Sequence, residues 1–206
     1  MERHFIAISG GGFSEVRNSQ IDTYLLNIKR NERPLHIAFI ATASNDAQGY
    51  IDKFYKAFAN ERPTHITIQD FTRPDIQSYV NSLDIIYVGG GNTSYLLKMW
   101  RKTGFDEVLK QAYKHGVMLA GISAGAMCWF EQCYTQIDGD LQSVQGLGIL
   151  SGSYLPHADE ATIAPFEAWG QRHHITPLYA LKDEETIHFV NERYTLKLVE
   201  RMDNHV

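Results

Sequence analysis

The sequence predicts an open, doubly wound α/β fold with a mostly parallel sheet and helices on both faces. Short apolar runs without polar alternation, such as 35–41, indicate strands that are covered on both faces, as in parallel sheets. Segments with apolar residues at helical spacing lie between these runs. Two of the runs end in glycine triplets, which indicate tight turns. A regular alternation of strand and helix is typical of this fold class.

The elements of the first two thirds of the chain follow from these patterns. Strands are expected at 4–9, 35–41, 65–68, 84–88 and 117–122. Helices are expected from Ser19 onward and around 50–58, 74–83, 95–100 and 105–114. Pro74 suits the first turn of its helix, and Gly116 suits a C-cap. Because the carboxyl ends of such strands carry the ligand sites of open α/β sheets, the loops there are the candidate functional regions.

The last third of the chain is less regular. Residues 134–145 are polar and predict a hairpin or a loop, and a glycine-rich segment follows at 146–152. A helical stretch is expected around 166–169, and strands at 186–190 and 194–199 predict a C-terminal hairpin. Since no linker, repeat or low-complexity tract is visible, we expect a single domain over 1–206.

Composition narrows the function classes. The 206 residues are 44% hydrophobic, enough for a full core, and the formal net charge of −5 includes no basic block of the kind that nucleic-acid-binding proteins carry. No apolar stretch is long enough for a signal peptide or a membrane span, so we expect a cytoplasmic protein without membrane association.

Cys128 and Cys133 form no disulfide framework, and the glycine triplets match no nucleotide-binding motif. The possible ligands His157, Asp159 and Glu160 lack metal-site spacing, so no metal or cofactor is expected.

Ser123 is the candidate nucleophile. It lies in Gly121-Ile-Ser-Ala-Gly125, directly after a predicted strand and before a small-residue segment that could begin a helix. The Gly-x-Ser-x-Gly pattern presents a serine hydroxyl on a sharp turn between strand and helix. Backbone N–H groups at the helix start suit an oxyanion that forms beside the serine.

A nucleophilic serine needs a base and a group that orients the base. His157 is the favoured base among the downstream histidines, because it follows Pro156 in a loop that could reach the carboxyl edge of the sheet. The orienting acid stays open at this point; the candidates are Glu131, Asp138, Asp140 and Asp159. The glycine run 89–91, together with the N–H of Ala124, could bind the oxyanion.

These motifs together resemble the peptidase E (aspartyl dipeptidase) family. The resemblance rests on Gly121–Ala126, on Gly89–Thr93 after the strand Ile85–Val88, and on Pro156-His157. That family shares its fold with class I glutamine amidotransferases and includes cyanophycinase among its relatives. The resemblance covers residues 6 to about 190, nearly the whole chain.

The resemblance implies a serine peptidase with Ser123 as nucleophile and His157 as base. It implies oxyanion donors at the amides of Gly90 or Gly91 and Ala124. Counting on from the nucleophile places the acid at Asp138, with Glu131, part of a Cys-Trp-Phe-Glu run, as the rival. Asn92 and Arg172 are the further candidate substrate-binding residues, Arg172 because an aspartyl substrate needs a cation beside its carboxylate.

The predicted function is the hydrolysis of small peptides, Asp-X dipeptides among them, through an acyl-enzyme in a monomer or homodimer. Two alternatives stay open. An α/β-hydrolase esterase uses the same serine pattern, but few residues follow Ser123 for the strands and helices that fold adds after its nucleophile. A non-catalytic small-molecule binding or regulatory module would use Ser123 merely as a small residue at a tight turn.

Overall fold

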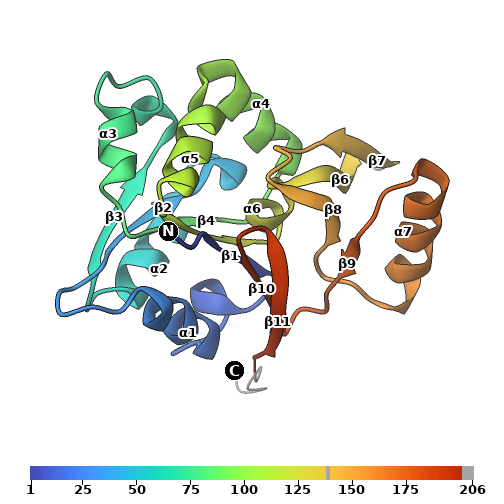
Figure 1. The fold of residues 1–206 in the computed structure, drawn as a ribbon, viewed down its shortest axis with the longest axis horizontal. Coiled ribbons are helices and arrows are strands. Elements are labelled where there is room, and N and C mark those ends of the chain that lie inside the picture. Colours follow the sequence, from blue (N-terminus) through green and yellow to red (C-terminus); the bar gives the residue numbers. More distant parts are fainter. Residues whose placement is uncertain (138–139, 201–206) are drawn as a thin grey trace.

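The computed structural model describes residues 1–137 and 140–200 (Figure 1). Within them, a seven-stranded sheet has the strand order β11-β10-β1-β5-β4-β2-β3. Its parallel strands are β1 (His4–Ile8), β2 (His36–Ile40), β3 (Arg62–Ile66), β4 (Ile85–Val88) and β5 (Met118–Ile122). The strands β10 (Glu185–Val190) and β11 (Arg193–Val199) form an antiparallel hairpin, and β10 pairs antiparallel with β1. The predicted fold class and the C-terminal hairpin are confirmed.

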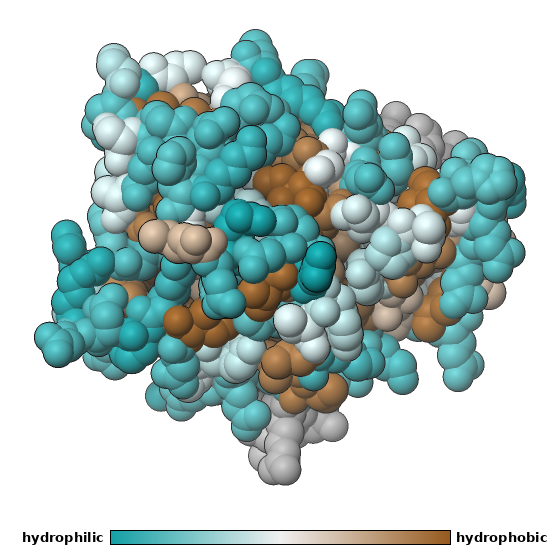
Figure 2. Space-filling view, in the orientation of Figure 1, coloured by the Kyte–Doolittle hydropathy of each residue, from teal (hydrophilic) through white to brown (hydrophobic). Residues whose placement is uncertain are grey.

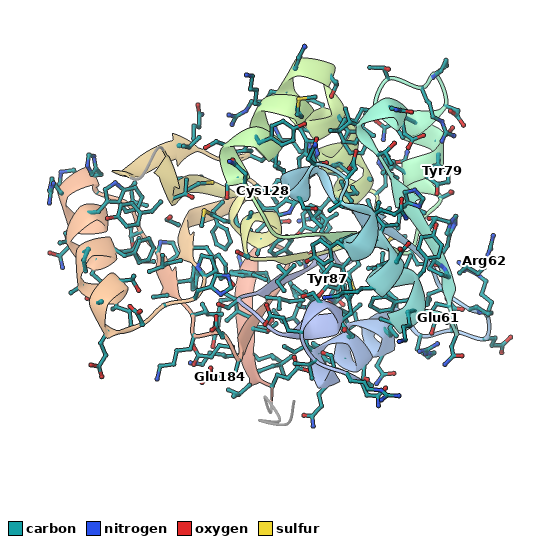
Figure 3. All side chains as sticks on the ribbon, turned by 180° about the vertical axis from the view of Figure 1, so that it is seen from behind. Glu61, Arg62, Tyr79, Tyr87, Cys128 and Glu184 are labelled. Carbon is teal, nitrogen blue, oxygen red and sulfur yellow. The ribbon has the colours of Figure 1, made fainter. Side chains whose placement is uncertain are left out.

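The strands read as continuous apolar runs because both of their faces are buried. Along β1, Phe5 and Ala7 belong to one hydrophobic core, whereas Ile6 and Ile8 belong to the other. Burying an aliphatic or aromatic side chain of this kind contributes about 1.5–3 kcal/mol to stability. Figure 3 shows side chains filling the space on both sides of the sheet. Successive side chains along such a strand therefore enter the two cores in turn, rather than alternating between core and solvent. This is why the strands appear in the sequence as uninterrupted apolar runs.

Helices cover each face of this sheet. The helices α1 (Gln20–Lys29) and α2 (Gln48–Ala57) contribute to the core that contains Ile6 and Ile8. On the other face lie α3 (Ile76–Asn81), α4 (Thr93–Thr103), α5 (Phe105–Lys114) and the short α6 (Ala124–Met127). Short 3-10 helices occupy Gly12–Ser14, Thr42–Ser44 and Ile68–Asp70. The turns that follow β1, β4 and β5 lie at the carboxyl ends of adjacent strands, which brings the predicted functional loops together.

Most predicted strands differ from the observed ones by about one residue at an end, but one is shifted further, toward the N-terminus. The strand expected at 65–68 begins earlier, at Arg62, and includes Pro63, which is paired with Ile37 of β2. Proline has no backbone N–H to donate to a neighbouring strand, so it is rarely found in a strand that is paired on both sides. It is tolerated here because β3 is the edge of the sheet.

A second sheet follows the nucleophile segment and was not predicted. Its strand order is β7-β6-β8-β9, from β6 (Phe130–Ile137), β7 (Asp140–Gln145), β8 (Leu150–Leu155) and β9 (Leu178–Ala180). The helix α7 (Glu160–His173) packs beside it through Phe166 and Trp169, which stack with Tyr134 of β6. The hairpin expected at 134–145 is present as β6 and β7. The helix that begins after Ser123 is short: α6 ends at Met127, so Glu131 belongs to β6 and not to that helix.

The surface of the face seen in Figure 2 is largely hydrophilic. Leu196 and Val199 of β11 are among the exposed large apolar residues of the described part of the chain. Among the described residues, no helix combines the length and the apolar character needed to cross a lipid bilayer.

Candidate active site

The turn between β5 and α6 presents Ser123 in an unusual backbone conformation. Its φ of 53° and ψ of −115° lie outside the regions that side-chain-bearing residues prefer. The amide of Ser123 donates to the carbonyl of Ile8 over 2.9 Å, which fixes the turn to the end of β1. A Cβ atom at Gly121 would lie 2.0 Å from the carbonyl oxygen of Gly125, and one at Gly125 would lie 2.3 Å from that of Val88. Only glycine fits these two positions, which accounts for the Gly-x-Ser-x-Gly spacing.

His157 reaches Ser123 from the loop after β8. Its Nε2 lies 3.0 Å from the Oγ of Ser123, within hydrogen-bond distance. Its Nδ1 lies 2.5 Å from the Oδ1 of Asp183, in the turn that precedes β10. If Nδ1 carries the proton and donates to the carboxylate, Nε2 is free to accept the proton of the serine hydroxyl. The side chains of His157 and Asp183 are 48% and 58% exposed, so the arrangement is open to solvent.

The carboxylate beside His157 is neither of the two that the sequence favoured. Asp138 lies outside the described residues. Glu131 lies on β6, where its Oε2 accepts a hydrogen bond of 2.7 Å from the amide of Gly152. Asp183 was overlooked because its position depends on the antiparallel pairing of β10 with β1, which no local motif indicates. One feature of the sequence could have indicated Asp183. It lies shortly before the strand predicted at 186–190, at the edge of the sheet where the other candidate loops lie.

Backbone amides lie next to the serine. Gly90 is in contact distance of Ser123, since a Cβ at Gly90 would lie 3.4 Å from that of the serine. The amide of Gly90 makes only a long contact of 3.4 Å with the hydroxyl of Tyr50. Within the described residues, the amides of Gly91 and Ala124 have no hydrogen-bond acceptor. These N–H groups are therefore free to donate to a ligand.

Residues 5–197 match the family model of peptidase family S51. The chain belongs to peptidase family S51. This family membership agrees with the resemblance to peptidase E that the serine and glycine motifs indicated, and it makes the chain a serine-type peptidase. It favours the peptidase prediction over the esterase and binding-module alternatives.

Relatives of this S51 peptidase support the assignment. It is 42% identical over 196 residues to the uncharacterized peptidase YgaJ of Bacillus subtilis strain 168, covering 93% of this chain and 85% of the relative. Its fold is similar to that of a Listeria monocytogenes EGD-e protein described provisionally as peptidase E, with a TM-score of 0.70, 22% identity, and 97% and 99% of the two chains covered. A peptidase from an acI-B1 Actinobacterium matches with a TM-score of 0.65, 17% identity, and 91% and 83% coverage. The two solved structures support the fold.

Asn92 and Arg172 are the remaining predicted site residues of the S51 peptidase. Asn92 is the N-cap of α4, and its side chain accepts a hydrogen bond of 2.8 Å from the amide of Tyr95. Arg172 is exposed in the last turn of α7, where it lines a shallow hollow with Trp169. No hydrogen bond joins the side chain of Asn92 or Arg172 to that of Ser123 or His157 in the part of the chain that the structure describes. The substrate-binding roles of Asn92 and Arg172 stay predictions.

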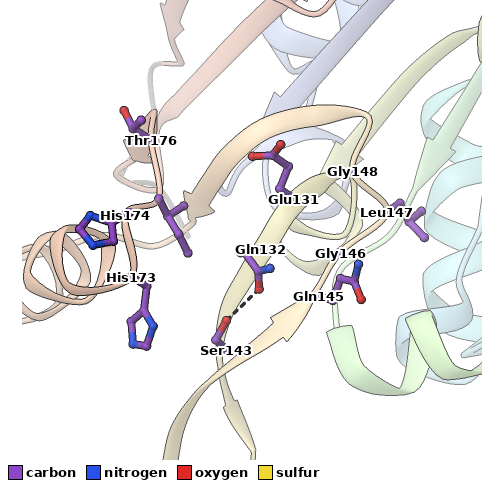
Figure 4. A pocket seen from close by; sticks show the side chains of 11 residues that line it. Glu131, Gln132, Ser143, Gln145, Gly146, Leu147, Gly148, His173, His174 and Thr176 are labelled. Atoms are coloured by element: carbon purple, nitrogen blue, oxygen red, sulfur yellow. Dashed lines mark hydrogen bonds between the residues drawn. The ribbon is translucent and has the colours of Figure 1, made fainter.

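Glu131 lines a different hollow of the S51 peptidase. This hollow, of about 550 Å³, lies between β6, the segment after β7 and the end of α7, and its lining is mainly polar (Figure 4). Gln132 and Ser143 form one wall, joined by a hydrogen bond of 2.9 Å, and His173 and His174 lie opposite. None of Ser123, His157 and Asp183 belongs to its lining.

Other nucleophilic and metal-binding groups offer no competing site in the described part of the chain. Cys128 and Cys133 are buried, and burial raises the pKa of the Cys133 thiol to about 12, so it stays protonated near neutral pH. Figure 3 shows Cys128 at the end of α6, inside the molecule. Across residues 1–137 and 140–200, no group of three or more His, Cys, Asp or Glu side chains is placed to hold a metal ion.

Proposed function

We propose that this S51 peptidase hydrolyses short peptides through an acyl-enzyme on Ser123, with His157 as general base and Asp183 as the orienting carboxylate. The observation that carries the proposal is the continuous chain from the Ser123 Oγ through both ring nitrogens of His157 to Asp183. In such a chain, the carboxylate holds the imidazole in the tautomer that can accept the serine proton. The preference for short peptides rests on the resemblance to peptidase E.

The reaction follows from the positions of these groups. The Oγ of Ser123 attacks the scissile carbonyl carbon while the Nε2 of His157 accepts the hydroxyl proton. The oxyanion that forms receives hydrogen bonds from the amides of Ala124 and of Gly90 or Gly91. The peptide C–N bond then breaks, and the imidazolium returns its proton to the leaving amine. Water, deprotonated by His157, attacks the acyl carbon; the bond from this carbon to the Oγ of Ser123 breaks, the imidazolium returns its proton to the Oγ, and the second product leaves.

Asp-X dipeptides are the first substrates to test, because the peptidase E resemblance points to them. An aspartyl side chain in the substrate would need a cation beside it, and Arg172 is the residue that we proposed for this role. Replacing Arg172 by Gln should raise KM for Asp-X dipeptides and leave KM for Ala-X dipeptides unchanged. An equal effect on both substrates would remove Arg172 from the specificity site.

Substitution of the serine tests the proposed function. Ser123→Ala should lower kcat/KM for peptides by roughly 10⁶-fold, because the nucleophile is lost. Ser78→Ala on α3 is the matched control, since this exposed serine lies away from His157, and it should keep wild-type rates. Circular dichroism and the unfolding temperature check that both variants fold.

Covalent labelling separates the proposal from its alternatives. A serine-directed phosphonate should modify wild-type protein at Ser123 and leave Ser123→Ala unmodified, as read by mass spectrometry of peptides. A non-catalytic binding module would not react. An esterase would hydrolyse simple esters and spare dipeptides, whereas a peptidase of this type should cleave dipeptides. Retention of full peptidase activity by Ser123→Ala would overturn the mechanism.

A further inference from the structure

The carboxyl end of β1 contacts the backbone of every member of the Ser123–His157–Asp183 arrangement. The carbonyl of Ile8 accepts a hydrogen bond of 2.9 Å from the amide of Ser123. The side chain of Ser9 accepts one of 2.8 Å from the amide of His157. The amide of Gly10 donates one of 2.9 Å to the carbonyl of Asp183. Three consecutive residues thus fix three loops that are far apart in the sequence.

Ser9 is the residue of this segment that acts through its side chain. It is completely buried, and its hydroxyl both donates and accepts a hydrogen bond within the protein. It accepts from the amide of His157 and donates to the carbonyl of Leu181 over 3.0 Å. The same carbonyl accepts the amide of Ala158 at 2.8 Å, so Ser9 connects the loop that carries the histidine with the segment that carries the carboxylate.

The hydrogen bond from the amide of His157 to Ser9 matters because the backbone of His157 is strained. Its φ of 54° lies in the left-handed region, which costs a side-chain-bearing residue about 1–2 kcal/mol and persists only where the surroundings hold it. The hydrogen bond to Ser9 is the contact that holds the amide of this residue. Loss of the acceptor would leave the histidine backbone free to relax, and a shift of the ring by about 1 Å is enough to lower turnover severely.

We propose that Ser9 is a positioning residue of the peptidase site, which sets the His157 ring against both the Ser123 Oγ and the Asp183 carboxylate. The inference rests on the proposed function of these three side chains. Ser9 itself does not touch substrate, since its side chain is completely buried and its hydroxyl bonds to the backbone of two neighbouring segments. Its loss should therefore reduce kcat and leave substrate binding nearly unchanged.

The test compares Ser9→Ala with Ser153→Ala. Ser153 is the matched control: it is equally buried, and its hydroxyl donates to the carbonyl of Gln132 at 2.8 Å, away from His157. Both variants should lose stability to a similar extent. Ser9→Ala should lower kcat by about 10- to 100-fold with KM changed by less than about twofold, whereas Ser153→Ala should keep the wild-type kcat.

A spectroscopic signature reports the position of the ring directly. The proton between His157 Nδ1 and Asp183 should give a far-downfield NMR resonance in wild type, which Ser9→Ala should shift or broaden and Ser153→Ala should leave in place. If Ser9→Ala does not fold, Ser9→Cys is measured instead. It has nearly the same size and a weaker hydrogen-bonding group, and it should also lower kcat.

Two results would overturn the proposal. Folded Ser9→Ala or Ser9→Cys with wild-type kcat and an unchanged resonance would show that the hydroxyl has no role in positioning. A fall in activity that only matches the unfolded fraction would assign Ser9 to stability alone. Ser123→Ala is assayed in parallel: if it is inactive while Ser9→Ala is fully active, the peptidase mechanism stands and only the role of Ser9 fails. If Ser123→Ala stays active, both proposals fall.

Discussion

Ser123 and His157 share a backbone feature that sets them apart from most residues of the sheet. Both have positive φ values, 53° and 54°, although neither is glycine. Such conformations cost about 1–3 kcal/mol each and are concentrated at functional sites. The amide of each is hydrogen-bonded to Ile8 or Ser9 at the buried end of β1, and these bonds hold the strained residues in place.

Replacement of the carboxylate tests which acid completes the site. Asp183→Asn should lower kcat by roughly 10⁴-fold, because an amide that donates to Nδ1 selects the wrong imidazole tautomer. Glu131→Gln should change kcat by less than about twofold, since its carboxylate bonds to Gly152. Asp138→Asn is measured beside them by steady-state kinetics. A loss in Asp138→Asn that matches or exceeds that in Asp183→Asn would return the role to Asp138.

The three side chains of the proposed catalytic site differ in how far the sequence could predict them. Ser123 lies in a local motif whose glycines are required by contacts within a few residues, and His157 follows a proline in a loop at the expected edge. Asp183 lies in the run Lys-Asp-Glu-Glu, where neighbouring acids are equally plausible. Only the pairing of β10 with β1 selects it, and that pairing joins the two ends of the chain.

At the scale of elements, the decisive contact is the close approach of β5 and α6. The Cα of Gly121 faces the carbonyl of Gly125 so closely that no side chain fits between the strand and the helix. The two elements are therefore joined by backbone contact, with Ser123 at their junction. Small residues over 124–126 let α6 lie against the ends of β4 and β5.

Gly121→Ala should disrupt this junction. The added methyl group would lie 2.0 Å from the carbonyl oxygen of Gly125, so the turn must move. We expect the free energy of unfolding to fall by at least about 3 kcal/mol. We also expect nearly all labelling of Ser123 by the phosphonate to be lost. Gly49→Ala is the control, because nothing lies within 4 Å of the new methyl group on α2. It should be neutral or stabilising by up to about 1 kcal/mol in urea unfolding. Similar losses in both variants would contradict the argument.

The sequence predicted the elements of the main sheet well and the second sheet poorly. Strands buried on both faces have continuous apolar runs that need no knowledge of their neighbours. In contrast, β8 is interrupted by Ser151, Gly152 and Ser153, and β9 has only three residues. These strands become recognisable when β8 pairs in parallel with both β6 and β9 across long stretches of chain.

At the scale of the whole molecule, Glu200, far along the chain, contacts the loop after β1 and the start of α1. Asp22 of α1 is buried, and Glu200, directly after β11, accepts the amide of Gly12 at 3.0 Å. Tyr87 of β4, labelled near the centre of Figure 3, lies beside Gly12. Burial, followed by the nearby charge of Glu200, raises the pKa of Asp22 from 3.8 to about 8. The folded protein therefore holds a proton here that the unfolded chain releases.

This proton makes stability depend on pH. Between pH 3.8 and about 8, the folded state binds more protons at Asp22 than the unfolded state, so the free energy of unfolding should fall as pH rises across this window. Asp22→Asn removes the titration and should flatten the dependence by up to about 1.4 kcal/mol per pH unit. Urea unfolding at several pH values measures the slope. Asp52→Asn, an exposed position on α2, should keep the wild-type slope. Equal slopes in all three proteins would contradict the assignment.

The pairing of β10 with β1 also bears on how the enzyme acquires reactivity during synthesis. Ser123 and His157 leave the ribosome before Asp183, and β1 waits unpaired on one side until β10 follows. Under the proposed mechanism, a nascent chain that stops short of β10 would have the nucleophile and the base but lack the carboxylate that orients them. Full reactivity of Ser123 would then arise only after β10 has paired with β1.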